Sequence, residues 1–569
     1  MIKVGGDFEA AETNFDRGYT GGQFWSRSAN TAAGAPGRWT VTEFDKVVRT
    51  LQPGEDPNLM AGELLCVNDN AVCSTTRSAK ADVNNRNFSA YIQDSWNVRP
   101  NLTLDAGLRW ERQIGYVGEG LAGTKSPEGL IIPDKGYELP NLIAPRLGFI
   151  FDPTKEGKSK VFGHWGRFFE NVPMDLNARS FGGEITNQQV YNQNRFTTSS
   201  GSYDPNCDVN HGTMDPVGTL RQCSDKADPI LLGGGSGFVA PSLKGQYTDE
   251  LVLGTEYEIM ADVKVGLNYV HRNMPRVIED MYWSPTGEYT IVNPGEDFHA
   301  DAEELRAKAA AETDPTLKQL YTDHADQLDY AKRFAKPIRN YDAIQLTATQ
   351  RPTKSSLILA SYTFSQSRGN YPGLFSTETL QDDPNITSLY DLPELMANRY
   401  GPMGLDRPHN VKFDGFYMFD FKKAGGLTTG VSLRAQSGIP HNALAAHPFY
   451  GIDESYVLPR GALERSPVTT NVDIHLAYGY RINKTTELSA FVRVFNLFNT
   501  QHELDRDETY TFDNALPIVN GTPDDLKHLK AVDENGNETN TTPSPNKNFG
   551  HLNSLTAPRS MQLGFRLTF

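Results

Sequence analysis

The residue types that perform chemistry in enzymes are scattered along this sequence and do not assemble into a recognisable site. The chain contains no Walker or dinucleotide-binding glycine loop, no HExxH zinc motif and no GxSxG nucleophile elbow. None of the twelve histidines lies four residues from another. The stretches DENGNE (533–538) and LLGGGSG (231–237) are favoured as ordinary loops rather than ion-binding or phosphate-binding loops. The sequence therefore predicts a protein that is not an enzyme and has no metal site and no cofactor.

Four cysteines form two pairs that are each close in sequence, Cys66 with Cys73 and Cys207 with Cys223. Their spacings, C-x6-C and C-x15-C, differ from the CxxC spacing of zinc and redox sites. Both pairs lie in polar stretches, and disulfides persist in oxidising compartments. We therefore expect the two local disulfides Cys66–Cys73 and Cys207–Cys223, with unpaired thiols as the alternative.

The remaining candidates are charged side chains on the polar side of segments that alternate between apolar and polar residues. Between Leu102 and Glu111 the apolar positions are even-numbered, and Arg109 falls on the opposite side. In a membrane barrel the polar side faces the lumen, where charges line the route of a solute or contact a plug. The predicted lumen-facing residues are Arg109, Glu111, Glu256, Lys264, Arg434, Arg493 and Arg566. Solvation by lumen water is the alternative role for each of them.

Strands of alternating polarity must position these side chains, and such segments recur along the whole chain. The connections between them are alternately very short, as in NVRPN and RINKT, and very long, as between 171 and 244. Short periplasmic turns and long extracellular loops are typical of outer-membrane barrels. About fourteen such segments are found by this test. They start near Ile2, Asn87, Asn101, Ala144, Lys160, Gln246, Ala261, Asp342, Ser355, His409, Leu427, Thr470, Thr485 and Arg559.

Composition is compatible with this arrangement. The mean hydropathy is −0.50. No run approaches the roughly 18 apolar residues of a transmembrane helix, a test that membrane strands escape. The net charge of −16 is opposite in sign to that of most nucleic-acid-binding proteins. The predicted fold class is all-β: a transmembrane antiparallel meander β-barrel of about fourteen strands, with residues 1–569 forming one outer-membrane β-barrel domain.

One long connection has a helical composition. Residues 300–335 are rich in Ala, Glu, Lys and Leu, and apolar residues such as Leu320, Leu328 and Phe334 recur at roughly helical spacing, with Pro315 interrupting. We expect a helical extracellular loop insertion at 300–335. Its apolar stripe should pack on itself or on neighbouring loops.

The last residues, RSMQLGFRLTF, alternate between apolar and polar positions and end on an aromatic ring. This ending resembles the C-terminal signature that the barrel-assembly machinery recognises. The resemblance predicts a barrel-assembly signal made of Phe565, Leu567 and Phe569.

Longer segments resemble one family, the TonB-dependent receptors. The stretches AYIQDSWNVRPNLTLDAGLRWE (90–111) and VRVFNLFN (492–499) are similar to its barrel strands. The stretches APRLGF (144–149), WGRFFE (165–170), YDLPELMANRYGPMGLDRPHN (390–410) and QSGIP (436–440) resemble its Oar-like branch. Each motif is only moderately specific, but their order and spacing extend the resemblance over nearly the whole chain.

The resemblance implies a receptor in the cell outer membrane that takes up a large, scarce solute with energy delivered by TonB. In that branch a carboxypeptidase-regulatory-like domain and a plug usually precede a barrel of about 22 strands. No segment here resembles the plug, the TonB box or a signal peptide. We therefore expect the C-terminal part of a larger barrel, with its first and last strands not fully paired with each other. A complete barrel of about fourteen strands is the alternative.

The implied partners are outer-membrane lipid, the barrel-assembly machinery, the TonB complex through a missing N-terminal region, and an unknown solute, with no nucleic acid. The alternative function is an Oar-like surface, adhesion or secretion role, in which the long acidic loops are the working surface. An enzyme inside the lumen is a third possibility that would need a nucleophile or paired carboxylates on the polar faces.

Overall fold

The structure is a computed structural model that describes most of the chain. The described residues are 1–17, 24–28, 38–50, 65–66, 72–74, 79–118, 121–123, 126, 129–182, 184–192, 230–233, 237–283, 288–376, 378–379, 381, 384, 387–483, 485–533 and 535–569. No helix among these residues is long and apolar enough to cross a membrane.

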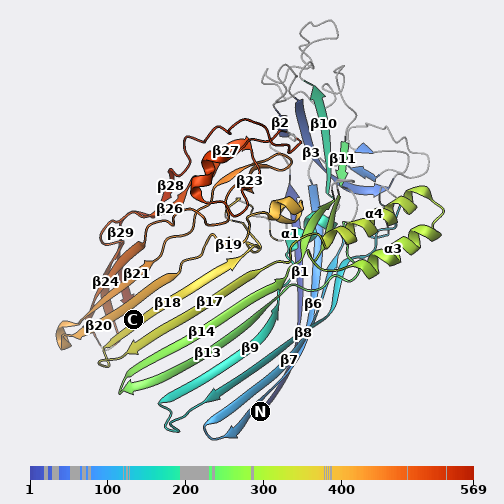
Figure 1. Ribbon diagram of the computed structural model, residues 1–569. Helices are drawn as coiled ribbons and strands as arrows, with labels where there is room; N and C mark the ends of the chain where they lie inside the picture. Colours follow the sequence, from blue (N-terminus) through green and yellow to red (C-terminus); the bar gives the residue numbers. More distant parts are fainter. Residues whose placement is uncertain are drawn as a thin grey trace.

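Fourteen long antiparallel strands pair in chain order to form one large curved sheet (Figure 1). Short turns join them at the lower end of Figure 1, and long loops join them at the upper end. The strands are β1 (Ile2–Arg17), β6 (Ala79–Arg99), β7 (Leu102–Tyr116), β8 (Lys135–Phe151), β9 (Ser159–Phe169), β13 (Tyr247–Met260), β14 (Val263–Arg276), β17 (Arg339–Gln350), β18 (Ser356–Gly369), β20 (His409–Asp420), β21 (Gly426–Gln436), β24 (Thr469–Arg481), β25 (Glu487–Phe495) and β29 (Ser560–Thr568).

The predicted all-β fold is therefore confirmed, and each expected strand has a counterpart. Two starts were wrong by several residues, because β6 begins at Ala79 and β8 at Lys135. Both strands extend upward into the loop region. Polar residues occupy both faces there, as in ADVNNRN (81–87), so the alternation that marks a lipid-facing strand is lost.

Regular registers give the sheet two chemically different faces. Leu104, Leu108, Val265, Leu267, Ile474 and Leu563, which the sequence predicts to face lipid, all lie on one face. Leu108 and Leu267 are 46% and 44% exposed, although both are large and apolar. Side chains of this kind are stable when exposed only if lipid covers them.

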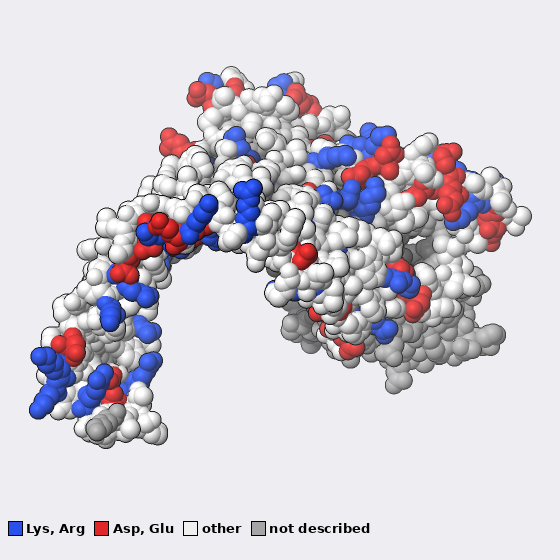
Figure 2. All heavy atoms as spheres, turned by 90° about the horizontal axis from the view of Figure 1, so that it is seen from below, with Lys and Arg blue, Asp and Glu red and all other residues white. Residues whose placement is uncertain are grey.

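The first and last strands are not joined in the described residues. β1 pairs only with β6, and β29 pairs only with β25. Seen from below, the molecule is an open arc with one hollowed side (Figure 2). The expected gap between Ile2–Phe8 and Met561–Phe569 is thus present.

The long loops build a separate layer of small sheets and helices above the large sheet (Figure 1). The strands of this layer are β2 (Phe24–Ser28), β3 (Arg38–Thr50), β4 (Leu65–Cys66), β5 (Val72–Ser74), β10 (Glu184–Asn192), β11 (Ile230–Gly233), β12 (Phe238–Val239), β15 (Glu279–Trp283), β16 (Glu288–Val292), β19 (Gly401–Pro402, paired with β18), β22 (Leu444–His447), β23 (Gly451–Tyr456), β26 (Glu503–Arg506), β27 (Thr509–Asn514) and β28 (Leu552–Leu555). The helices are α1 (Met174–Phe181), α3 (His299–Ala311), α4 (Pro315–Ala331) and the 3-10 helices η3 (Ser388–Tyr390), η4 (Pro393–Met396) and η6 (Pro523–His528), while η5 (Lys422–Ala424) lies in a short turn.

Helices α3 and α4 form a hairpin that projects sideways from this layer (Figure 1). They occupy the range in which the sequence predicts a helical insertion. Pro315 begins α4 rather than interrupting a helix, and the Asp314 side chain caps it by accepting from the backbone N–H groups of Thr316 and Leu317 at 2.8 and 3.2 Å. Leu328 of α4 is buried with Leu389 and Tyr390 of another loop, so the stripe packs on a neighbour.

We predict opposite effects of an added charge on the two faces of β17. Leu346, 47% exposed, shares the lipid-facing side with Leu267, whereas Thr347 is exposed on the other side opposite Gly266. Leu346→Arg should lower the free energy of unfolding in lipid vesicles by about 2–4 kcal/mol, because an arginine near the bilayer midplane is poorly solvated. Thr347→Arg, the matched control, should change it little. Equal effects at both positions in urea titrations would contradict the assignment of faces.

Candidate functional site

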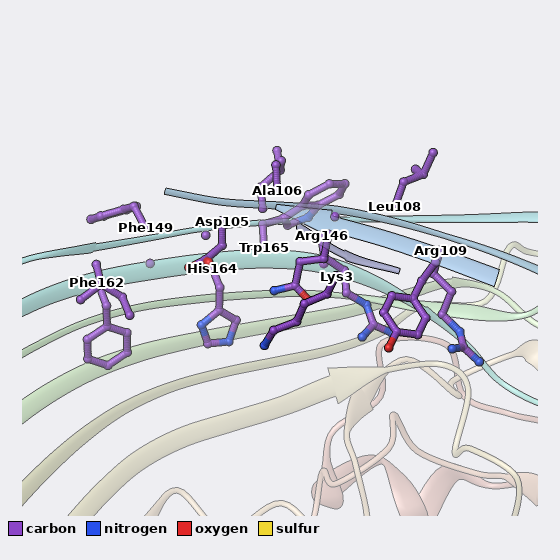
Figure 3. Close-up of a pocket in the computed structure, with 18 of the residues that line it drawn as sticks. Lys3, Asp105, Ala106, Leu108, Arg109, Arg146, Phe149, Phe162, His164 and Trp165 are labelled. Atoms are coloured by element: carbon purple, nitrogen blue, oxygen red, sulfur yellow. The ribbon is translucent and has the colours of Figure 1, made fainter. Parts of the chain in front are cut away.

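The seven charged residues predicted to face the lumen lie on the same face of the large sheet. The registers connect this face without interruption from β6 to β29: Arg109 lies opposite Tyr91, Lys264 opposite Thr349, and Arg493 opposite Gln562. Figure 3 shows that Arg109, Arg146 and His164 project to one side of the sheet, away from Leu108 and Phe149. The charged face is therefore the concave one.

Four of these residues form two local ion pairs. Arg109 pairs with Glu111 and reaches Asp7 at 3.4 Å, while Lys264 Nζ lies 3.1 Å from Glu256 Oε2. Each pair lies on the concave face and is partly exposed. Pairs of this kind fix side-chain positions but contribute little stability.

The other three differ in their partners. Arg434 Nη2 donates to both carboxylate oxygens of Asp414, each at 2.9 Å, and Arg493 Nε donates to His475 Nδ1 at 3.4 Å. For Arg566 the described residues provide no ion-pair partner. Inspection of the sequence missed Asp414 and His475, although strand parity alone would have placed them on the polar face.

Several basic side chains surround a hollow of about 770 Å3 on β1 and β6–β9 (Figure 3). Asp105 is the only acid among the described residues that line it. Arg146 lies over the Phe168 ring at 4.7 Å and Lys160 over the Phe162 ring at 4.3 Å. Aromatic faces orient such cations without neutralising them. The hollow therefore presents net positive charge, and its cationic side chains are Lys3, Arg109, Arg146, Lys160 and, when protonated, His164.

Above the sheet, buried hydrogen bonds connect loops that follow different strands. Glu279 of β15 is fully buried and accepts from the Tyr371 hydroxyl at 2.9 Å and from the Thr387 N–H at 3.1 Å. Arg399, with 2% of its side chain exposed, lies 3.1 Å from Glu454. The Asn398 amide donates to the Ile518 carbonyl at 3.1 Å. Four loops are thus joined by polar contacts that are buried or partly buried.

Burial changes the protonation of the acids in this layer. Complete burial raises the pKa of Glu279 well above its ordinary value, and the nearby Asp280 acts in the same direction. Burial and Asp280 also raise the pKa of Asp391. The hydrogen bonds that Glu279 accepts act in the opposite sense but are outweighed, because no cation accompanies the carboxylate into the interior.

One buried cluster resembles a hydrolase triad. His441 lies between Ser466 Oγ, 2.8 Å from Nε2, and Glu508 Oε1, 2.8 Å from Nδ1. However, the Ser466 hydroxyl donates to Glu503 at 3.0 Å, so its proton is not directed to the imidazole. Ser466 is also only 6% exposed. The cluster is suited to holding β26 against its neighbours and not to attack on a substrate.

The remaining predicted residues are placed as follows. Phe565, Leu567 and Phe569 are exposed by 82%, 54% and 92% on the apolar face at the end of the chain. Cys66 lies opposite Cys73 across the β4–β5 pair, and their disulfide stays a prediction. Cys207 and Cys223 lie outside the described residues. Within the described part of the chain, no group of three or more His, Cys, Asp or Glu side chains is arranged to hold a metal ion.

Comparisons of the sequence with known proteins find outer-membrane proteins. The family model described as an outer membrane beta barrel domain matches residues 1–452. The TonB-dependent transporter Oar of Myxococcus xanthus is 32% identical over 587 residues, which cover 100% of this chain and 49% of that protein. The chain thus spans about half the length of the curated relative that it matches.

Solved structures give more distant similarities. The ferripyoverdine receptor of Pseudomonas aeruginosa is 11% identical with a TM-score of 0.41, covering 89% of this chain and 46% of that one. The outer membrane transporter YddB of Escherichia coli is 11% identical with a TM-score of 0.40, covering 88% of this chain and 60% of that one. No conclusion about function rests on these two similarities.

We predict that two arginine–carboxylate pairs contribute very differently to the free energy of unfolding. Arg434 and Asp414 are 40% and 43% exposed, so Arg434→Met should cost no more than about 1 kcal/mol of unfolding free energy. Arg399→Met should cost about 3–5 kcal/mol within the loop layer, because it leaves Glu454 buried without its partner. Proteolysis of the loops under native conditions would measure the second effect. Equal protease resistance of the Arg399 variant and the parent would contradict it.

We also predict that the loop layer loosens as pH rises. The pKa values of Glu279 and Asp391 in the folded protein are raised above the ordinary 4.5 and 3.8. The stability that these two protonated carboxyls contribute to the loop layer is therefore fully present below the ordinary values. It is lost as pH rises through the raised values. Hydrogen exchange in 387–399, corrected for intrinsic rates, should therefore become faster toward alkaline pH. Asp391→Asn should weaken this dependence, and an unchanged profile would show that this carboxyl does not titrate there.

Proposed function

We propose, because this chain belongs to the Oar-like branch of the TonB-dependent receptors of the outer membrane, that it forms the barrel wall of a transporter for a large, scarce solute. Energy would come from the TonB complex. The plug and the TonB-binding segment of such a receptor would be supplied by residues other than these 569.

The charged concave wall is the observation that carries this proposal. A wall that served only to close the membrane would need no cluster of cations around a hollow of about 770 Å3. The side chains of Lys3, Arg146 and Lys160 have no carboxylate partner among the described residues. They favour a solute, or a plug surface, that carries negative charge.

The apolar convex face indicates that this wall lies in a membrane. Its exposed leucines and aromatic rings require lipid, and the family places the chain in the outer membrane. Fourteen strands form an open arc, which is consistent with a barrel of more strands and hence with a lumen larger than that of a small closed barrel. A lumen of this width suits a solute too large for simple diffusion through a porin.

A surface or secretion role is the second candidate, and the loop layer favours it. Three buried apolar clusters lie in that layer, so the loops form a folded platform rather than loose connections. Such a platform could present a fixed surface to another cell or protein. It would act without energy from TonB.

The test uses the complete receptor in its own cells. Periplasmic extracts are compared by untargeted mass spectrometry among strains that carry the parent gene, no receptor, or no TonB. We predict that solutes lost without the receptor are also lost without TonB. The variant Lys3→Gln/Arg146→Gln/Lys160→Gln should lower their uptake about tenfold or more, because charge-assisted contacts are lost.

The matched control is Lys158→Gln/Lys354→Gln/Lys423→Gln, which removes the same charge from the short turns and should leave uptake unchanged. Solutes that depend on the receptor but not on TonB would contradict transport driven by TonB. A defect confined to adhesion or secretion would then support the second candidate.

A further inference from the structure

A cluster of basic side chains surrounds a single carboxylate at the base of the α3–α4 hairpin. Glu296 lies 3.6 Å from Arg276, 3.6 Å from Lys336 and 3.8 Å from Lys244. Next to it, Lys332 pairs with Asp297 at 2.6 Å. The hairpin-base cluster, defined as Lys244, Arg276, Lys332 and Lys336, thus has four cations against the two carboxylates in direct contact with it, Glu296 and Asp297. Asp329 acts on Lys332 from a greater distance.

The backbone holds the cluster together. The connections before α3 and after α4 meet at the hairpin base, where the Gly295 N–H donates to the Ala331 carbonyl at 2.9 Å. Lys244 comes from the loop before β13 and Arg276 from the end of β14. Three chain segments therefore bring their cations to one place, and the connection before α3 brings the carboxylates. The cluster does not result from a run of lysines in the sequence.

The charges are arranged with the carboxylate inside and the ammonium groups outside. The Glu296 side chain is 17% exposed, whereas those of Lys244, Lys332 and Lys336 are 50%, 63% and 63% exposed. The Arg276 Nε atom is too far from Glu296 for a hydrogen bond, and no described atom accepts one from it. The excess positive charge consequently faces outward. This is notable in a chain with a net charge of −16.

The cluster continues the lipid-facing side of the sheet. The Tyr247 ring lies between the guanidinium groups of Arg167 and Arg276, at 3.9 and 5.4 Å from its centroid. The regular β9–β13 register puts Arg167 and Tyr247 on the face of Leu251 and Leu253, and Leu253 is 44% exposed. Following the lipid-facing side upward along β13 therefore leads from leucines to Tyr247 and then to the basic cluster.

The cluster also lies where the molecule overhangs the membrane. Figure 1 shows the hairpin projecting sideways beyond the upper ends of the strands. In Figure 2, seen from the side of the short turns, Lys and Arg gather with a few acids at the inner end of this projection, outside the hollowed side of the arc. A surface visible from that direction and outside the arc faces the outer leaflet.

We propose that the hairpin-base cluster binds the phosphate groups of anionic lipids in the outer leaflet. Lysine ammonium groups are common protein ligands of phosphate, and those of Lys244, Lys332 and Lys336 are exposed here. Cations just above an apolar belt meet headgroups at the depth where lipid phosphates lie. The contact would anchor the projecting hairpin on the membrane surface. This inference depends on the outer-membrane location and not on transport.

The experiment measures binding of phosphorylated lipid A, and of the same lipid after phosphatase treatment, to the complete purified receptor in detergent. The readouts are native mass spectrometry and the melting temperature. We expect saturable binding that requires the phosphates and weakens at high salt. Lys244→Gln/Lys332→Gln/Lys336→Gln should bind about 10- to 100-fold more weakly.

Two further variants separate lost binding from lost folding. Lys244→Arg/Lys332→Arg/Lys336→Arg keeps the charge and should keep binding, as should the turn control Lys158→Gln/Lys354→Gln/Lys423→Gln. Equal binding of the two lipids, or unchanged binding by the glutamine variant, would overturn the proposal. Displacement by inorganic phosphate at equal concentration would overturn the lipid as its source. Solute uptake by the glutamine variant should stay normal, which distinguishes this result from a failure of the transport proposal.

Discussion

Backbone polar groups cannot remain unpaired in hydrocarbon, and the rest of this structure depends on that constraint. Each unpaired N–H or C=O there costs several kcal/mol, so a strand in the membrane must pair along its whole length. The twelve inner strands meet this requirement along both edges by pairing in simple chain order, while β1 and β29 are each paired along one edge among the described residues. The same pairing fixes which side chains face lipid and which face the lumen, because the side-chain period of a strand is two.

The constraint also explains where the buried core lies. Over most of its height the large sheet turns its apolar side chains outward to lipid and its charges inward. Burial from water occurs instead in the loop layer, around residues such as Phe181, Tyr390 and Leu458. The large sheet is thus stabilised by contact of its apolar face with lipid, whereas the loop layer is stabilised by burial of apolar side chains away from water.

Features with a short period could be predicted from the sequence. The alternation around Leu104 and Leu267 specified strands and faces, and the helical spacing of Leu320 and Leu328 specified the hairpin. Helix α1 was missed because its eight residues, MDLNARSF, are too few to establish a period. The partners of Arg434 and Glu279 could not be predicted, because those contacts join strands or loops whose relative heights depend on register and on loop packing.

The buried links between loops have a mechanical consequence. Glu279, Tyr371, Glu454 and Ile518 belong to four different loops, and the three links all start from one of them, the loop between β18 and β20, which contains Tyr371, Asn398 and Arg399. A force that lifts one of the other three loops is therefore passed to the loop between β18 and β20. Moving these loops apart at the upper end would require the buried links to break together. Opening of the loop layer should therefore be cooperative, and slow compared with the motion of a free loop. The same buried links would hold the curvature of the sheet below them.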